Sequence, residues 1–338
     1  MKAILTLVFA LSVQVVAAQS TDSSQFYCQK GIVEKNASRY STAAQYFNQS
    51  LAFDSTNKEA LMGNAFVYKQ MRKLDQSRKL YLKLFELTPN DKKVTEELMN
   101  IYFNYKQYAK AVEFAKLCDG CTNVDKIKGI SYYELEDYPS AEIFLKKAIA
   151  VNPSDAEVVY KMARNYVEME EYNKAIPYYF IAVRFKEAKP MWMYEQGILL
   201  YNMSDYSGAV NAFIEAVNHG YSRNNDFNEN LGYACLYNGE YEQGEKLLME
   251  IWLKKPGNKD LLRGLAEVLY QKRQYDRSLI YCQKMLELDA NDGKALYQAG
   301  LCFQKKGQVD KGQQMCDKAI FLDPSLESLR RKKEMTSL

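Results

Sequence analysis

Histidine is almost absent from this 338-residue sequence, in which His219 is the single example. One histidine argues against zinc sites built from several histidines and against proteases with an HExxH motif. Glycine and proline are also scarce, at 16 and 7 residues, as in a chain that is helical almost throughout. A formal net charge of +3 argues against nucleic acid as the main partner. With 47% hydrophobic and 26% charged residues, the composition is that of a folded protein.

The N-terminal residues predict a signal peptide over 1–18. Lys2 precedes the apolar run AILTLVFALSVQVVAA, and the small residues Val16 and Ala18 predict cleavage after Ala18. The alternative is an uncleaved anchor, although the run is short for a membrane span. No cysteine lies at the cleavage point, since Cys28 is too far downstream, which argues against a lipoprotein. We expect an exported protein with no membrane span after cleavage, periplasmic or secreted.

One spacing of small and aromatic residues recurs along the chain. In EDYPSAEIFLKKAIAVNPSD, Tyr138 is followed by Ala141, Phe144, Ala148 and then Asn-Pro. Related series of residues, which we call ladders, are Tyr40, Ala43, Phe47; Tyr172, Ala175, Tyr179, Ala182; Tyr206, Ala209, Phe213, Ala216; and Tyr241, Gly244, Pro256. The step is about 34 residues, and a weaker copy at Tyr108 and Ala111 is cut short before Gly129.

This spacing has a mechanical explanation. Small residues let two helices cross closely, and aromatic side chains fill the space beside them. Asp137 and Asp205 are placed to cap a helix, and Pro139 falls in a first turn, where its missing N–H costs little. Asn-Pro at 152–153 ends the helix. Each unit therefore predicts a helical hairpin that cannot bury its apolar face without neighbours.

The ladder resembles the tetratricopeptide repeat family. The resemblance covers about nine units over residues 23–326 and implies an all-α solenoid, a right-handed superhelix of antiparallel helix pairs. Departures occur where Ser55, Glu187, Tyr221 and Ala290 replace the terminal proline. Residues 327–338 predict a capping helix, whose basic residues 330–333 are expected to face water; contact with an anionic membrane is the alternative.

Sequence motifs of catalysis are missing, so we expect neither an enzyme nor a cofactor. There is no GxGxxG motif, no P-loop and no nucleophile elbow. Cys118 and Cys121 form a CxxC in LCDGCTN, but Cys118 ends a predicted helix, whereas a redox motif needs a helix N-terminus. A local disulfide is the preferred interpretation; free thiols and catalysis stay open, and zinc would need two more ligands. Four of the remaining cysteines, 235, 282, 302 and 316, fall at packing positions, and a bond between 282 and 302 is the less favoured alternative.

The resemblance also implies that the first helix of each pair lines a concave groove. On a first helix, three residues share one exposed face: the residue that follows the small residue, the residue four positions before it and the residue three positions after it. The candidate groove residues are Lys126, Tyr133, Tyr160, Arg164, Tyr194, Tyr201, Tyr233, Tyr270 and Tyr297, with Tyr237 bordering them. The matching early positions, Cys28 with Ile32, Met62 with Phe66 and Glu96 with Asn100, lack the lysines and asparagines with which some family members grip a peptide carboxylate.

Tyrosines on such a face predict a binding surface, because tyrosine offers a large contact area with few rotors. We expect a scaffold that holds an extended segment or a helix of another protein, with Lys126, Arg164 and Arg263 setting its polarity, in a cell-envelope or secretion assembly. The alternatives are rings that only pack on neighbouring helices, a glycan-binding module, or a self-associating structural protein. The sequence does not fix the oligomeric state.

Overall fold

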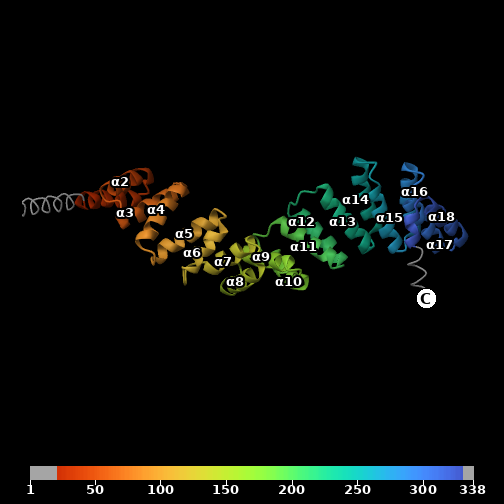
Figure 1. Cartoon of the computed structure of the whole chain (residues 1–338), viewed down its shortest axis with the longest axis horizontal. Helices are drawn as coiled ribbons and strands as arrows, with labels where there is room; N and C mark the ends of the chain where they lie inside the picture. Colours follow the sequence, from red (N-terminus) through yellow and green to blue (C-terminus); the bar gives the residue numbers. More distant parts are fainter. Residues whose placement is uncertain (1–20, 330–338) are drawn as a thin grey trace, which may run out of the picture. The chain divides into compact units, whose positions relative to one another are not determined.

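The computed structural model describes residues 21–329 and divides into two compact units, one ending at Glu171 and one beginning at Tyr172. All regular elements of the described residues are helices, in agreement with the predicted all-α solenoid (Figure 1). The predicted signal peptide and residues 330–338 of the predicted capping helix lie outside the described residues.

The first unit begins with a helix over residues 21–36. It continues with α2 (Tyr40–Phe53), α3 (Lys58–Gln70), α4 (Leu74–Leu87), α5 (Lys92–Asn104), α6 (Tyr108–Lys116), α7 (Val124–Glu134), α8 (Tyr138–Val151) and α9 (Ala156–Glu168). Consecutive helices pack in pairs, α3 on α4, α5 on α6 and α7 on α8. Less extensive contacts join each pair to the next, as expected of stacked hairpins.

The second unit begins with α10 (Tyr172–Ala182). It continues with α11 (Pro190–Asn202), α12 (Tyr206–Asn218), α13 (Asn225–Asn238), α14 (Tyr241–Lys254), α15 (Lys259–Gln271), α16 (Tyr275–Leu288), α17 (Gly293–Lys305), α18 (Val309–Leu322) and the 3-10 helix η1 (Pro324–Leu326). Here α11 pairs with α12, α13 with α14, α15 with α16 and α17 with α18.

Helix starts follow from short polar side chains. The predicted caps are confirmed: the Asp137 carboxylate accepts from the backbone N–H of Ser140, and that of Asp205 accepts from Gly208 N–H. The first helices of other pairs begin in the same way, with Asp155 accepting from Val158 N–H and Asp292 from Ala295 N–H. Each such bond satisfies an N–H group that the first helical turn leaves without a partner.

The turn inside each hairpin contains one residue in the left-handed region. These residues are Ser38, Arg72, Lys106, Glu136, Glu170, Ser204, Gly239, Arg273 and Gly307. After Glu136, the N–H of Asp137 donates to the carbonyl of Tyr132 at 2.9 Å, which is the bond pattern of a helix that ends in a left-handed residue. Most neighbours in this series are 34 residues apart, but Lys106 and Glu136 are 30 apart, which places the missing residues in the third pair.

Glycine is expected to improve this turn where another residue occupies it. A non-glycine residue in the left-handed region destabilises the folded state by about 1 kcal/mol. Glycine avoids this strain, but it loses more conformational entropy on folding, which offsets part of the gain. Arg273→Gly should therefore raise the free energy of unfolding by up to about 1 kcal/mol, and Gly239→Ala should lower it by about 1 kcal/mol. Urea denaturation followed by circular dichroism measures both. Gly257→Ala is the matched control, because Gly257 lies outside the left-handed region and, as at Gly239, a β-carbon there meets nothing within 4 Å. Equal effects at all three sites would contradict this explanation.

The shortened third pair ends in a bonded corner. Helix α6 has 9 residues, whereas α8 has 14. Just after α6, Cys118 and Cys121 are joined by a disulfide, and both side chains are buried. The ammonium of Lys92 donates to Gly120 O at 2.7 Å, and Thr122 N–H donates to Glu96 Oε1 at 3.0 Å, so the corner is attached to α5.

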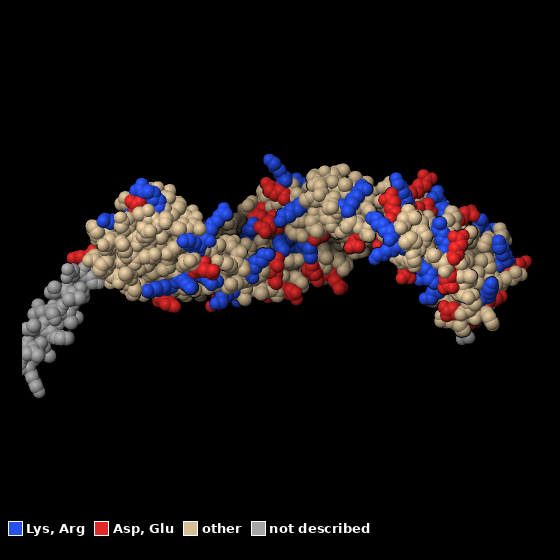
Figure 2. All heavy atoms as spheres, turned by 90° about the horizontal axis from the view of Figure 1, so that it is seen from above, with Lys and Arg blue, Asp and Glu red and all other residues tan. Residues whose placement is uncertain are grey.

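Close helix contacts depend on glycine. A β-carbon on Gly197 of α11 would lie 2.6 Å from Cε1 of Phe213, a fully buried ring of α12. In the next pair, a β-carbon on Gly244 of α14 would lie 2.6 Å from the carbonyl oxygen of Gly232. The predicted pairing of small residues with filling aromatic residues is therefore present in the packing. On the face drawn in Figure 2, charged side chains of both signs are interspersed.

Candidate functional site

The predicted groove tyrosines of the second unit lie on its first helices. Tyr194 and Tyr201 are on α11, Tyr233 and Tyr237 on α13, and Tyr270 on α15. All five are half-buried rather than freely exposed. Because tyrosine at partial exposure offers both ring area and a hydroxyl group, this face can still contact a partner.

The exposure expected of Tyr297 is wrong. Its side chain on α17 is buried, at 6% exposed, in a cluster that includes Cys316 and Leu326. Leu326 belongs to η1, which follows the last helix pair and covers this end of α17. Tyr297 therefore belongs to the core and does not line a surface.

Three tyrosines and a lysine from consecutive pairs form what we call the tyrosine cluster. Tyr206 at the start of α12 stacks on Tyr237 of α13, with centroids 4.7 Å apart and planes at 15°. The ring of Tyr201 meets both edge-on, at 5.6 Å from Tyr206 and 6.0 Å from Tyr237. The ammonium of Lys272, just after α15, lies 5.4 Å from the centroids of both stacked rings. The cluster thus joins α11, α12, α13 and the end of α15 through rings and one cation.

Tyr194 is held by its own set of contacts. Its ring stacks on Tyr221 at 4.7 Å, and its hydroxyl accepts from the Asn230 amide at 2.9 Å. Tyr233 lies over Gly264, where any β-carbon would collide with the phenolic oxygen. The glycine on α15 therefore makes room for a ring from the preceding pair, which the sequence rule for exposed faces could not indicate.

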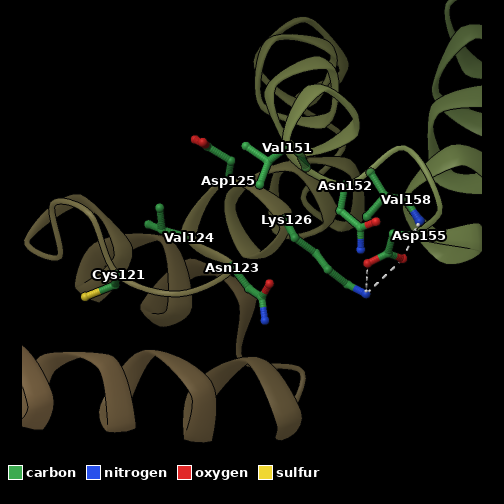
Figure 3. Close-up of a pocket in the computed structure, with 10 residues that line it drawn as sticks. Cys121, Asn123, Val124, Asp125, Lys126, Val151, Asn152, Asp155 and Val158 are labelled. Carbon is green, nitrogen blue, oxygen red and sulfur yellow. Dashed lines mark hydrogen bonds and ion pairs between the residues drawn. The ribbon is translucent and has the colours of Figure 1, made fainter.

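Lys126 of the first unit is a structural link rather than a free cation. Its ammonium lies 2.8 Å from Asp155, the capping residue of α9 (Figure 3). It also lies 2.9 Å from Glu157. Burial lowers the pKa of Lys126, but the hydrogen bonds to both carboxylates outweigh this and raise it. In the second unit, Lys259 pairs in the same way with Asp292, the cap of α17, at 3.0 Å. Lys126 also lines a cavity of about 120 Å³ beside Cys121 and Asn123.

The other predicted residues of the first unit occupy an interlocked surface. The ammonium of Lys161 lies 4.3 Å from the Tyr133 ring centroid and 2.6 Å from Glu134. Arg164 donates to Glu168 at 2.9 Å and approaches the Tyr160 hydroxyl at 3.5 Å. These contacts leave Tyr133 and Tyr160 half-buried.

A groove that the sequence analysis did not predict lies between the helix at 21–36, α3 and α5. It has a volume of about 530 Å³, and we call it the N-terminal groove. Its lining includes Ile32, Lys35, Met62, Phe66, Lys93 and Glu97. Ile32 and Phe66 follow the small residues Gly31 and Ala65, so the spacing rule does select this face, although its residues lack the pattern of a carboxylate grip.

Alkaline pH should unfold the protein as its buried tyrosines ionise. Burial raises the pKa of Tyr133, Tyr166 and Tyr201 to about 12, and Tyr166 also donates to Glu142. A tyrosine in the unfolded chain ionises at about pH 10, so above that pH the folded state retains protons that the unfolded state has lost. Stability is therefore complete below about pH 10 and falls up to about pH 12.

Tyrosinate absorbance and helical circular dichroism, recorded together, measure this effect. We expect a late group of tyrosines to ionise as the helical signal is lost. Ionisation of all 27 tyrosines near pH 10 with the helices intact would contradict it.

Residues suited to metal binding or thiol chemistry do not gather at these surfaces. Within residues 21–329, no group of three His, Cys, Asp or Glu side chains could hold a metal ion. Cys28, Cys235, Cys282, Cys302 and Cys316 are free and buried. Burial raises the pKa of Cys28 to about 11 and that of Cys235 to about 12, which disfavours the reactive thiolate. None of the described helices combines the length and apolar character needed to cross a membrane.

Comparison with known proteins identifies similar repeats. The model of the tetratricopeptide repeat family matches residues 194–255 and 236–295. A TPR repeat-containing protein of Methanocaldococcus jannaschii is 26% identical over 171 residues, 49% of this chain and 29% of that protein. Hsp70-Hsp90 organizing protein 1 of Glycine max is 24% identical over 208 residues, 58% of this chain and 35% of that protein. The chain thus spans less than two fifths of the curated relatives it matches.

Solved structures with similar helix pairs are also known. The C-terminal part of a TPR repeat-containing protein from Cytophaga hutchinsonii has a TM-score of 0.46 and 17% identity, over 68% of this chain and 95% of that structure.

Proposed function

Because this chain is a tetratricopeptide repeat protein, we propose that it is a non-enzymatic scaffold that holds an extended segment or a helix of another protein on the tyrosine-bearing face of its first helices. The observation that carries the proposal is the tyrosine cluster of Tyr201, Tyr206, Tyr237 and Lys272. It presents half-buried rings from successive helix pairs as one surface. The Glycine max relative, by its name, organises two other proteins, which supports a binding role.

The energetics favour a protein ligand for this cluster. Its rings are fixed by one another, so a partner loses little side-chain entropy on the scaffold side when it covers them. Tyrosine burial contributes strongly at interfaces, and the Lys272 ammonium can face a carboxylate or carbonyl of the partner. The glycan alternative fits less well, because Tyr206 and Tyr237 already cover one face of each other's rings.

Cross-linking from defined positions tests the proposal. A photoreactive phenylalanine analogue placed at Tyr237 should trap a discrete partner in intact cells, whereas the same group at Ile280 should not. Ile280 is 53% exposed on the second helix α16 and is the matched control.

The purified partner should then bind the triple variant Tyr201→Ala, Tyr206→Ala and Tyr237→Ala at least about tenfold more weakly than the unsubstituted chain, because the ring area of the whole cluster is lost. Circular dichroism must show that the helices remain. Equal trapping at both positions, or unchanged affinity of the triple variant, would contradict the proposal that the tyrosine cluster binds the partner.

The place of action that we propose is the bacterial periplasm, with secretion as the alternative, within an envelope or secretion assembly. It depends on the predicted signal peptide over residues 1–18. Mass spectrometry of the protein isolated from cells should find Gln19 as the first residue. A chain that retains its first 18 residues in the cytosolic fraction would exclude export.

A further inference from the structure

The N-terminal groove has an apolar floor. Ile32 comes from the helix at 21–36, and Met62 and Phe66 come from α3. Phe66 is 37% exposed, so part of its ring is open to a ligand in the groove. The volume of about 530 Å³ is within the range of sites that hold several side chains of a ligand.

Positive charge is in excess at the rim of the groove. Glu97 is neutralised by Lys69 at 2.6 Å, and Glu59 accepts a weak bond from the Cys28 thiol at 3.8 Å. By contrast, Lys35 and Lys93 take part in no ion pair within the described residues. The Lys35 ammonium lies 6.0 Å from the centroid of the Phe66 ring. The rim therefore presents two available cations against one available carboxylate, on either side of an apolar floor.

We propose that the N-terminal groove binds an acidic peptide segment that carries a central large apolar side chain. The apolar side chain would cover Phe66 and Met62, and flanking carboxylates would reach Lys35 and Lys93. No free chain end is needed, because aspartate and glutamate side chains supply the negative charge. This inference rests on the proposed scaffold function, but it assigns a second site, built from residues other than the tyrosine cluster.

A synthetic peptide tests this chemistry with the full chain. The probe is the acetylated and amidated hexapeptide EDLFDE, whose blocked ends leave only side-chain charges, and binding is measured by calorimetry. A peptide with lysine at every acidic position is the opposite-charge control. We expect the acidic peptide to bind, the basic peptide not to bind, and affinity to fall as salt is raised to about 0.5 M.

Variants locate the binding. Phe66→Ala, and separately Lys35→Glu with Lys93→Glu, should each weaken binding by at least about tenfold. The pair Lys79→Glu with Lys83→Glu on α4 makes the same change of charge away from the groove lining and should change affinity less than about twofold. Circular dichroism verifies that each variant folds.

Three results would overturn the proposal: no binding of the acidic peptide, equal binding of the basic peptide, or equal losses in the groove and α4 variants. Because the scaffold proposal is tested at Tyr201, Tyr206 and Tyr237, a trapped partner there with no peptide bound here would reject only the N-terminal groove.

Discussion

Gly244→Leu is expected to lower the free energy of unfolding of the second unit by about 3 kcal/mol or more. The β-carbon at this position would lie 2.6 Å from the carbonyl oxygen of Gly232 and 2.8 Å from Cγ of Leu236. A carbonyl of a helix cannot rotate away as a side chain can, so α13 and α14 must separate. Since α13 carries Tyr237, the substitution should also loosen the tyrosine cluster.

Denaturant unfolding followed by circular dichroism, with hydrogen exchange to locate the affected pair, measures the loss. Gly257→Leu is the matched control, because a β-carbon at this exposed turn meets nothing within 4 Å, and its effect should stay within about 0.5 kcal/mol. Protection from exchange that falls equally in α13, α14 and the first unit would show that the cause is not this contact.

Phe213→Ala should cost about 4 kcal/mol of unfolding free energy. The ring is fully buried, lies edge-on to Phe227 at 5.7 Å and is 5.6 Å from Tyr194. Its removal leaves a cavity beside Gly197, which has no side chain to fill it. The neighbouring backbone is held by helix hydrogen bonds and can collapse only in part.

Phe321→Ala removes the same group from a position that is 85% exposed on α18, and we expect a change within about 0.5 kcal/mol. Thermal and urea unfolding of the two variants give the comparison. Similar stabilities for both would mean that the Phe213 site can close around the missing ring.

The helix pairs could be predicted because their contacts depend on residue size and capping chemistry. Gly197 with Phe213 and Gly232 with Gly244 are visible as a spacing in the sequence, and Asp137 and Asp205 signal the helix starts. The left-handed turns could not be located residue by residue. Arg72 and Glu136 carry no local preference for that conformation, which the packing of the two helices imposes.

The candidate surfaces were predicted less completely, because a spacing rule assigns faces but not neighbours. Tyr297 obeys the rule and is nevertheless covered, since η1 follows the last pair. Lys126 was expected to set the polarity of a groove, but the cap of α9 lies within reach of its ammonium. Phe66 obeys the same rule. Its proposed role in peptide binding, however, depends on the two lysines that the helix at 21–36 and α5 bring to the rim of the N-terminal groove.

The links described between helix pairs join residues close in the sequence: Asn230 and Tyr194 are 36 positions apart, and the longest link, Lys272 with Tyr206, spans 66 positions. A chain connected in this way can acquire its structure hairpin by hairpin while it leaves a ribosome or a translocation pore, because no hairpin must wait for a remote segment. Slow passage through such a pore would then expose only one incomplete hairpin at a time to aggregation.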